Sequence, residues 1–315
     1  MTVQTQFTAP HPLKTAVLFL VFNRLDTTKD VFQAIRQAKP PRLYIAGDGA
    51  RADNDSDGRN VKAVRDYIMQ NIDWGCEVKT LFRDSNLGCK YAVSGAITWF
   101  FENEENGIVL EDDCLPSQSF FWFCEELLES YKNDMRVWHI SGNNFQENIQ
   151  RGDASYYFSQ YNHIWGWASW ANRWSMYDVE MKSFELFDSQ KKIYSVFGAK
   201  DIQNYWLSIF RKVYLGQIDT WDYQWTYTVL ANSGLSILPN KNLISNIGFG
   251  MDATHTKDLD SQHSKIPKTD LTVPVRHPVF VMQDVDADIF TTLRMFKHEN
   301  LIIKMAKRII KVLLK

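Results

Sequence analysis

The sequence predicts an α/β protein with a mostly parallel β-sheet flanked by helices. Short, continuous apolar runs of strand length alternate with segments of helical character over the first 110 residues. Such alternation is typical of βαβ units, whose strands are buried on both faces. Polar residues follow three of these runs directly, at the strand ends where parallel sheets bind ligands. The 315 residues suffice for one large domain with a sizeable core.

The individual elements follow from apolar runs, caps and breakers. Ala16–Phe22 is predicted to be the first strand, and Asp26-Thr27-Thr28 offers an N-cap for a helix that ends near Gln37, before Pro40-Pro41. The later elements are expected as strand Arg42–Ala46, helix Val61–Asn71, strand Val78–Phe82, helix Tyr91–Asn103, strand Gly107–Leu110, helix Phe120–Lys132, strand Val137–Ile140 and helix Asp201–Leu215. Residues 151–180 are rich in Trp and Tyr and show no regular pattern.

Four regions are predicted along the chain. They are an N-terminal extension over 1–14, the main domain over 15–257, a connector and helix over 258–300, and a basic amphipathic helix over 301–315. In that last helix, basic residues share one face, namely Lys304, Lys307, Arg308, Lys311 and Lys315. Two interpretations stay open: the helix binds an anionic membrane surface, or its apolar face packs on the protein.

Composition excludes several classes of protein. The net charge of −2 and the pI of 6.4 argue against nucleic acid as a partner. Residues 1–14 lack the apolar core of a signal peptide, and no apolar stretch approaches the roughly 20 residues that span a bilayer. The four cysteines have neither CxxC nor zinc spacing. We therefore expect a cytoplasmic location, peripheral on the inner face of the cytoplasmic membrane if the last helix binds lipid.

Three consecutive carboxylates, Glu111-Asp112-Asp113, directly follow the apolar strand that ends at Leu110. Adjacent carboxylates repel each other and cost stability unless positive charge lies beside them. A hard cation, Mn²⁺ or Mg²⁺, would satisfy them and could bridge a diphosphate. An exposed acidic turn is the simpler alternative.

Eight short segments occur in a fixed order along the chain. They are VLFLVFNR (Val17–Arg24), YIAGDGAR (Tyr44–Arg51), DSNLGCK (Asp84–Lys90), IVLEDDCLPSQSFF (Ile108–Phe121), ISGNN (Ile140–Asn144), IWGWASW (Ile164–Trp170), WDYQW (Trp221–Trp225) and NIGFGMDATHT (Asn246–Thr256). Together they resemble the nucleotide-diphospho-sugar transferases of the GT-A fold, closest to the N-acetylglucosaminyltransferase I type and its bacterial homologues. The resemblance covers residues 15–257 and implies a GT-A catalytic domain there.

The resemblance also implies roles for single residues. Arg24 and Asp48 would lie against the base and ribose of the donor, and Lys90 would approach the donor as well. Glu111 and Asp112 would contact the donor, with Asp112 facing the ribose or sugar. Asp113 would be the direct metal ligand, and His255, a late histidine near the diphosphate, would be a second residue at the metal. Asp222 would be the general base, although WDYQW is one residue longer than the family's segment.

Simpler roles stay open for each of these residues. Arg24 can pair with Asp26, Asp48 can serve a turn, Lys90 can be a solvated helix residue, and His255 can be a loop residue without a role. Asp222 can cap a helix, and Asp219 is a competing base. Trp165 and Trp167, on either side of Gly166, are predicted to form a wall for a sugar, with core packing as the alternative.

The sequence thus predicts transfer of a sugar from a nucleotide diphosphate donor, expected to be a UDP-sugar, to a hydroxyl of a glycan or lipid-linked acceptor, with inversion. A sugar-nucleotide nucleotidyltransferase is one alternative, but the segment after the first strand, FNRLDTT, lacks its glycine-rich loop. A metal phosphohydrolase would need more His and Asp ligands. A non-catalytic glycan-binding or membrane-adaptor protein would show no metal dependence.

Overall fold

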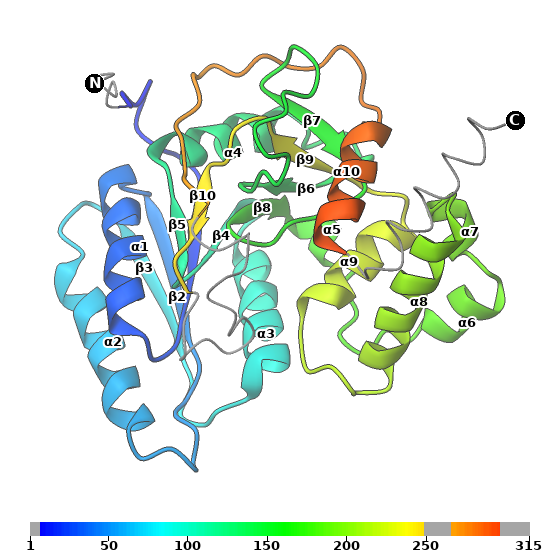
Figure 1. Ribbon diagram of the computed structural model, residues 1–315. Helices are drawn as coiled ribbons and strands as arrows, with labels where there is room; N and C mark the ends of the chain where they lie inside the picture. Colours follow the sequence, from blue (N-terminus) through cyan, green and yellow to red (C-terminus); the bar gives the residue numbers. More distant parts are fainter. Residues whose placement is uncertain (1–6, 249–265, 297–315) are drawn as a thin grey trace, which may run out of the picture.

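The protein is described by a computed structural model that covers residues 7–248 and 266–296 (Figure 1). Its centre is an eight-stranded sheet with helices on both faces. The sheet consists of β1 (Val17–Val21), β2 (Arg42–Gly47), β3 (Glu77–Phe82), β4 (Asn106–Glu111), β6 (Val137–Ser141), β7 (Tyr156–Ser159), β8 (Trp167–Trp170) and β9 (Leu235–Pro239). A second, two-stranded sheet pairs β5 (Cys114–Pro116) with β10 (Ile244–Asn246).

The strands of the large sheet lie in the order β3-β2-β1-β4-β8-β6-β9-β7. β1 to β4 run parallel to one another, and β6 runs parallel to β9. β8 is antiparallel to both β4 and β6, so the two parallel groups point the same way. Only β7 and β8 run against the other strands of this sheet. The predicted α/β fold with a mostly parallel sheet is confirmed.

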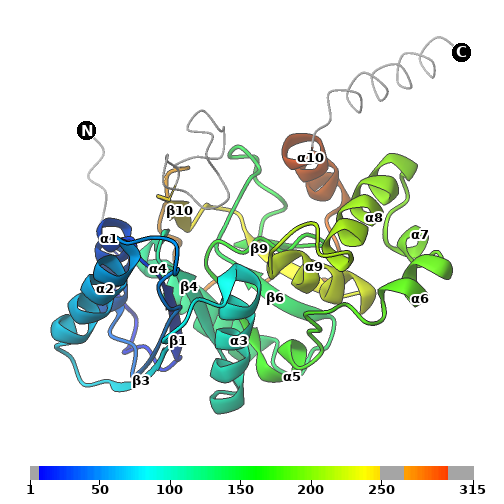
Figure 2. The ribbon, with the colours of Figure 1, turned by 90° about the horizontal axis from the view of Figure 1, so that it is seen from below.

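Helices cover both faces of the sheet. They are α1 (Leu25–Ala38), α2 (Asp57–Asn71), α3 (Gly88–Asn103), α4 (Gln118–Ser130), α5 (Ala171–Trp174), α6 (Phe184–Ser189), α7 (Ile193–Val196), α8 (Lys200–Tyr214), α9 (Asp222–Ala231) and α10 (Val285–Met295). Figure 2 shows α1 and α2 on one side of the sheet and α3 on the other. Helices α6 to α9 pack together in a separate aromatic cluster beside the sheet.

Side-chain alternation explains why the strands are continuously apolar. Val17, Phe19 and Val21 of β1 point into the core beneath α1, α2 and α4, whereas Leu18 and Leu20 point into the core beneath α3. Successive side chains of a strand face opposite sides, so a strand that is covered on both faces needs apolar residues at every position.

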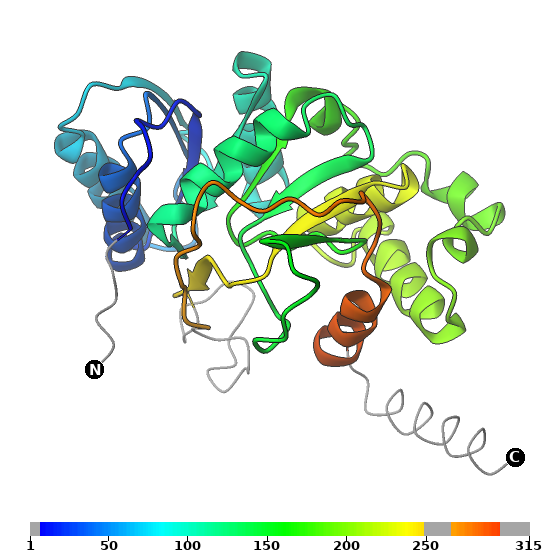
Figure 3. The ribbon, with the colours of Figure 1, turned by 90° about the horizontal axis from the view of Figure 1, so that it is seen from above.

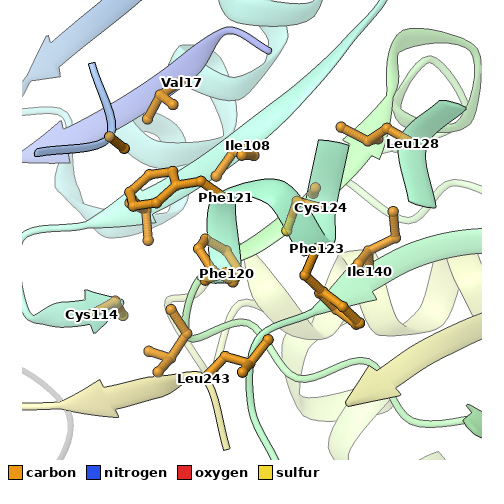
Figure 4. Packing of buried hydrophobic residues seen from close by; sticks show 14 of the residues in the cluster. Val17, Ile108, Cys114, Phe120, Phe121, Phe123, Cys124, Leu128, Ile140 and Leu243 are labelled. Carbon is orange, nitrogen blue, oxygen red and sulfur yellow. The ribbon is translucent and has the colours of Figure 1, made fainter. Parts of the chain in front are cut away.

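The α4 helix contributes aromatic rings to the core beneath α1, α2 and α4. Figure 4 shows Phe120, Phe121 and Phe123 among aliphatic side chains of the sheet, including Ile108 and Ile140. The connector that precedes α10 runs along the outer side of α4 (Figure 3). The backbone N–H of Val275 donates to the Glu126 carboxylate there, at 3.1 Å.

Most predicted elements agree with the structure within a few residues. The clearest differences are helix starts, because α2 begins at Asp57 and α3 at Gly88, before the predicted Val61 and Tyr91. The Trp- and Tyr-rich region contains two four-residue strands, β7 and β8. Val285–Met295, which lies in the region 258–300 predicted to contain a connector and a helix, is helix α10. His255 and the predicted helix over 301–315 lie outside the described residues.

No helix within residues 7–248 and 266–296 is long and apolar enough to span a bilayer.

The aromatic core beneath α4 predicts a large stability cost for truncation. Phe120 is completely buried, so Phe120→Ala is expected to lower the free energy of unfolding by about 3–5 kcal/mol. Urea unfolding monitored by circular dichroism measures this loss. Met69→Ala, at an exposed position on α2, is the control and should change stability by less than about 0.5 kcal/mol. Equal effects of the two substitutions would contradict this view of the core.

Candidate active site

The sheet reverses its winding direction between β1 and β4. The chain moves from β1 to β2 and β3 on one side, then returns through α3 to β4 on the other side of β1. The carboxyl ends of these two neighbouring strands lie together, with Leu20 opposite Glu111. A crevice forms at such a switch point, because the flanking helices lie on opposite faces of the sheet.

A cavity of about 550 Å³ opens at this edge, within the usual range for small-molecule sites. Polar side chains from the ends of several strands line it. They include Asn23, Arg24, Asp48, Arg51, Arg83, Asn86, Glu111, Asp112, Asp113, Asp219, Thr220, Asp222 and Asn246. The structure therefore brings together seven of the predicted site residues, namely Arg24, Asp48, Glu111, Asp112, Asp113, Trp165 and Asp222.

Arg24 neutralises the carboxylate cluster at the end of β4. Its Nη2 donates to Oδ1 of Asp112 at 2.5 Å and to Oδ2 of Asp113 at 3.0 Å. Burial opposes the guanidinium charge, but the two carboxylates outweigh burial and raise the pKa of Arg24 further. Arg24, three positions after β1, thus supplies the positive charge that the three adjacent carboxylates were expected to need. The alternative role for Arg24, an ion pair with Asp26, is not what the structure shows.

Asp112 and Asp113 differ in how fully their oxygens are used. The Asp112 side chain is buried, and its second oxygen accepts a hydrogen bond from the backbone N–H of Phe22 at 3.3 Å. Asp112 therefore ties the end of β4 to the end of β1. Asp113 is half-buried, and within the described part of the chain its Oδ1 accepts only a weak hydrogen bond, from the Cys114 thiol at 3.3 Å. Asp113 has the more available oxygen.

The charge of Glu111 is disfavoured in this setting. Burial raises the pKa of Glu111 to about 8, and the carboxylates of Asp113 and Asp112 act in the same direction. Burial likewise raises the pKa of Asp112 to about 6, although Arg24 opposes this effect. A further cation beside the cluster would favour the ionised form of both carboxylates.

Asp48 holds the start of α3. Its carboxylate accepts hydrogen bonds from the backbone N–H groups of Leu87, at 3.0 Å, and Gly88, at 3.1 Å. These groups begin α3, whose unpaired N–H groups favour a negative partner. This contact explains why α3 begins before the predicted position. Asp48 also lines the cavity, so capping and ligand contact involve the same side chain.

Asp222 lines the same cavity from the start of α9. It is the first residue of α9, and its Oδ1 accepts a hydrogen bond from the Thr220 hydroxyl. Asp219, the competing acid, is exposed at the cavity rim.

The two tryptophans of the WGW segment have different environments. Trp165 is half-buried and lines the cavity, as predicted for a wall. Trp167 is fully buried and stacks on Trp221, with ring centroids 5.9 Å apart, so the prediction that it contacts a sugar is wrong. Gly166 between them has φ of +67°, and a Cβ there would lie 2.6 Å from Ile244. This turn directs one ring to the cavity and the other into the core.

Lys90 lies apart from the cavity lining. It forms an ion pair with Glu180, with Nζ and Oε1 3.4 Å apart, and so the prediction of a donor contact is not supported by its position. Its place on the outer side of the first turn of α3 accounts for this, because Gly88, Cys89 and Ala92 face the cavity instead.

The sequence did not single out several lining residues. Arg51 pairs with the buried Asp57, at 2.6 Å, and lies over the Phe22 ring. Arg83 donates from Nη1 to the Ala92 carbonyl at 3.1 Å. Gly248 lies so close to Asp113 that a Cβ there would be 2.1 Å from Oδ2. Its place in the segment NIGFGMDATHT was the only indication in the sequence.

The carboxylates suit a divalent cation that arrives with a phosphate. No group of three or more His, Cys, Asp and Glu side chains in residues 7–248 and 266–296 has the arrangement of a metal centre. Mg²⁺ is commonly held by one or two carboxylates together with substrate phosphates. Asp113, with a partly available oxygen at the cavity, fits this kind of site.

No protein-family model matches the chain, and no curated protein matches it. Solved structures share part of its arrangement. The mannosyltransferase PcManGT from Pyrobaculum calidifontis, in complex with GDP-Man and Mn²⁺, gives a TM-score of 0.34 at 13% identity over 51% of this chain. The chain spans only 45% of that protein's length.

Two further structures are similarly distant. HddC from Yersinia pseudotuberculosis gives a TM-score of 0.32 at 12% identity over 50% of this chain and 77% of its own. An active-site mutant of LgtC gives 0.40 at 13% identity over 88% of this chain and 94% of its own. Likeness at this level leaves substrate and reaction to be argued from the residues of the cavity.

The raised pKa of Glu111 predicts a pH dependence of stability. The folded protein keeps Glu111 protonated up to about pH 8, whereas an ordinary glutamate ionises near 4.5. Without divalent cations, the free energy of unfolding should therefore fall, relative to Glu111→Gln, as pH rises from 4.5 to 8, by at most about 1.4 kcal/mol per pH unit. Urea unfolding at a series of pH values measures this difference.

Glu102→Gln, at an exposed position on α3, is the matched control and should follow the parent protein at every pH. Parallel stability curves for the parent and Glu111→Gln would show that Glu111 ionises normally in the folded state.

Proposed function

We propose that this protein is a divalent-metal-dependent glycosyltransferase that moves a sugar from a nucleotide diphosphate donor to a hydroxyl of a glycan or lipid-linked acceptor. One observation carries the proposal: the carboxylates that end β4 and the carboxylate that begins α9 line the same cavity at the switch point. The first group suits a cation with a diphosphate, and the second suits a base for the acceptor.

The cation side consists of Asp113, supported by Glu111 and Asp112. A bound Mn²⁺ or Mg²⁺ would neutralise charge on the departing diphosphate. Asp113 would hold the ion through the oxygen that Arg24 does not use. Arg24, which lines the same cavity, would keep its bonds to both carboxylates and contact the donor through another part of its guanidinium. Asp112, fixed by Phe22 and Arg24, keeps the end of β4 in place.

The donor side is assigned from the lining residues. Arg24, Asp48 and Arg51 border the part of the cavity between β1 and β2, where we place the nucleoside, and Trp165 offers a ring face for a sugar. A UDP-sugar donor and a relation to the N-acetylglucosaminyltransferase I type are proposed on the sequence segments alone. His255 remains a proposed contact to the diphosphate.

The reaction is proposed to invert the anomeric carbon in a single displacement. Asp222 accepts the proton of the acceptor hydroxyl as the oxygen bonds to the sugar, and the bond from the sugar to the diphosphate breaks with its electron pair. The Thr220 hydroxyl orients the Asp222 carboxylate. The four cysteines are free, which suits the proposed cytoplasmic location.

Donor binding is expected to be metal-dependent. In a thermal unfolding panel of UDP-, GDP-, dTDP- and CMP-sugars, one donor at about 100 times its Kd should stabilise the protein by roughly 2.7 kcal/mol with Mn²⁺ present. Asp113→Asn should abolish this stabilisation, because it removes the carboxylate with the available oxygen, while Glu102→Gln keeps it. No stabilisation by any donor, with or without Mn²⁺, would favour a non-catalytic protein, and release of pyrophosphate would favour a nucleotidyltransferase.

Asp222 should affect turnover and not donor binding. Asp222→Asn is expected to lower kcat by about 10²- to 10⁴-fold, because the amide cannot accept the proton. The donor-induced shift in Tm should stay unchanged. Asp219→Asn, at the rim of the same cavity, is the control and should retain activity. If Asp219→Asn loses activity and Asp222→Asn does not, the assignment of the base is reversed.

A further inference from the structure

A short stretch on the far side of the molecule from α2 exposes many large apolar side chains. Val279, Phe280, Met282, Val285 and Ile289 are exposed to 88%, 70%, 70%, 55% and 46%. These five residues, which we call the 279–289 strip, are among fourteen large apolar side chains that are exposed in the described part of the chain. The other nine are scattered between Met69 and Leu215. Such a concentration marks an interaction surface.

The strip is held in place by the fold. The backbone N–H of Asp284 donates to the Phe158 carbonyl at 2.7 Å, which fixes the strip to β7. Asp288 accepts hydrogen bonds from the Ser159 hydroxyl and from the backbone N–H of Gln160, the latter at 2.9 Å. These hydrogen bonds hold the backbone of the strip in a position that leaves its apolar side chains exposed.

The helix α10 separates its faces clearly. Ala287, Asp288 and Thr291 are buried against the protein, whereas Val285 and Ile289, one turn apart, lie exposed. The preceding bend adds Val279, Phe280 and Met282 to the exposed side. An apolar bend beside an apolar helix face is suited to enter the boundary between headgroups and acyl chains.

The charge of the sequence that follows identifies the partner. Residues 301–315 contain five Lys and Arg, ten apolar residues and no Asp or Glu. A surface that presents negative headgroups over an apolar interior complements both this composition and the strip. A Lys or Arg near the surface of an anionic membrane is attracted to it by about 1 kcal/mol. In the strip itself, Asp286 is exposed, and Asp284 accepts from the Ala287 N–H, so the cations of 301–315 outnumber the acids.

We propose that the 279–289 strip binds an anionic lipid bilayer together with the basic sequence 301–315, as two parts of one membrane anchor. A single weak element gives only marginal membrane binding, whereas two elements on one chain give stable association. The strip supplies a fixed apolar surface, and the basic sequence supplies the attraction to charge. This inference concerns a surface away from the cavity and is independent of the proposed reaction.

Vesicle sedimentation of the full chain tests the anchor. Vesicles of mixed phosphatidylglycerol and phosphatidylcholine should bind the protein, and vesicles of phosphatidylcholine alone should bind it much less. The double variant Phe280→Ser/Met282→Ser should bind the anionic vesicles about 10- to 100-fold more weakly, because two exposed apolar side chains are lost. Truncation after Asn300 should remove the preference for anionic lipid.

The matched control is Met69→Ser/Leu186→Ser, which removes two apolar side chains exposed to 45% and 59% on α2 and α6. It should bind vesicles as the parent does, and circular dichroism should show all variants folded. Unchanged binding of the Phe280→Ser/Met282→Ser variant would overturn the role of the strip. A lower Tm on truncation, or a changed oligomeric state of the double variant, would show instead that the chain's own end or a second copy covers the strip.

Discussion

The contact of Arg24 with Asp112 and Asp113 is the interaction on which the site depends. Carboxylates at the end of a buried strand are costly without a cation, and Arg24 reaches them only because β1 and β4 are neighbours with Leu20 opposite Glu111. The order of the strands in the sheet therefore determines which charges meet in the site. A cation bound through Oδ1 of Asp113 would share this carboxylate with Arg24, so the proposed site would combine an internal and an external positive charge.

The strands near the site could be predicted because buried strands of a parallel sheet consist of consecutive apolar residues. β1, β2 and β4 are covered on both faces, so each gives an uninterrupted run with a polar residue at its end. Asn23-Arg24, Asp48 and Glu111-Asp112-Asp113 were assigned to one edge of the sheet for that reason. β7 and β8 are four residues long and lie among aromatic side chains, which leaves no comparable pattern.

Other features depend on contacts between distant parts of the chain. Asn246 and Gly248 line the cavity because β10 pairs with β5, and Gly248 lies beside Asp113, whose carbonyl accepts from the backbone N–H of Ile247 at 2.8 Å. Trp165 lines the cavity and Trp167 is buried because Gly166 between them has a left-handed backbone conformation and packs against Ile244. Neither feature can be predicted from the neighbouring sequence, because each depends on which strands lie side by side in the fold.

The bond between Asp48 and the start of α3 also determines how a ligand lies in the cavity. Helix N-termini commonly receive phosphates, but the N–H groups of Leu87 and Gly88 already donate to a protein carboxylate. A phosphate placed there would meet negative charge and no free donor from these two residues. For the proposed nucleotide donor, this contact favours an orientation with the nucleoside toward α3 and the phosphates toward the end of β4.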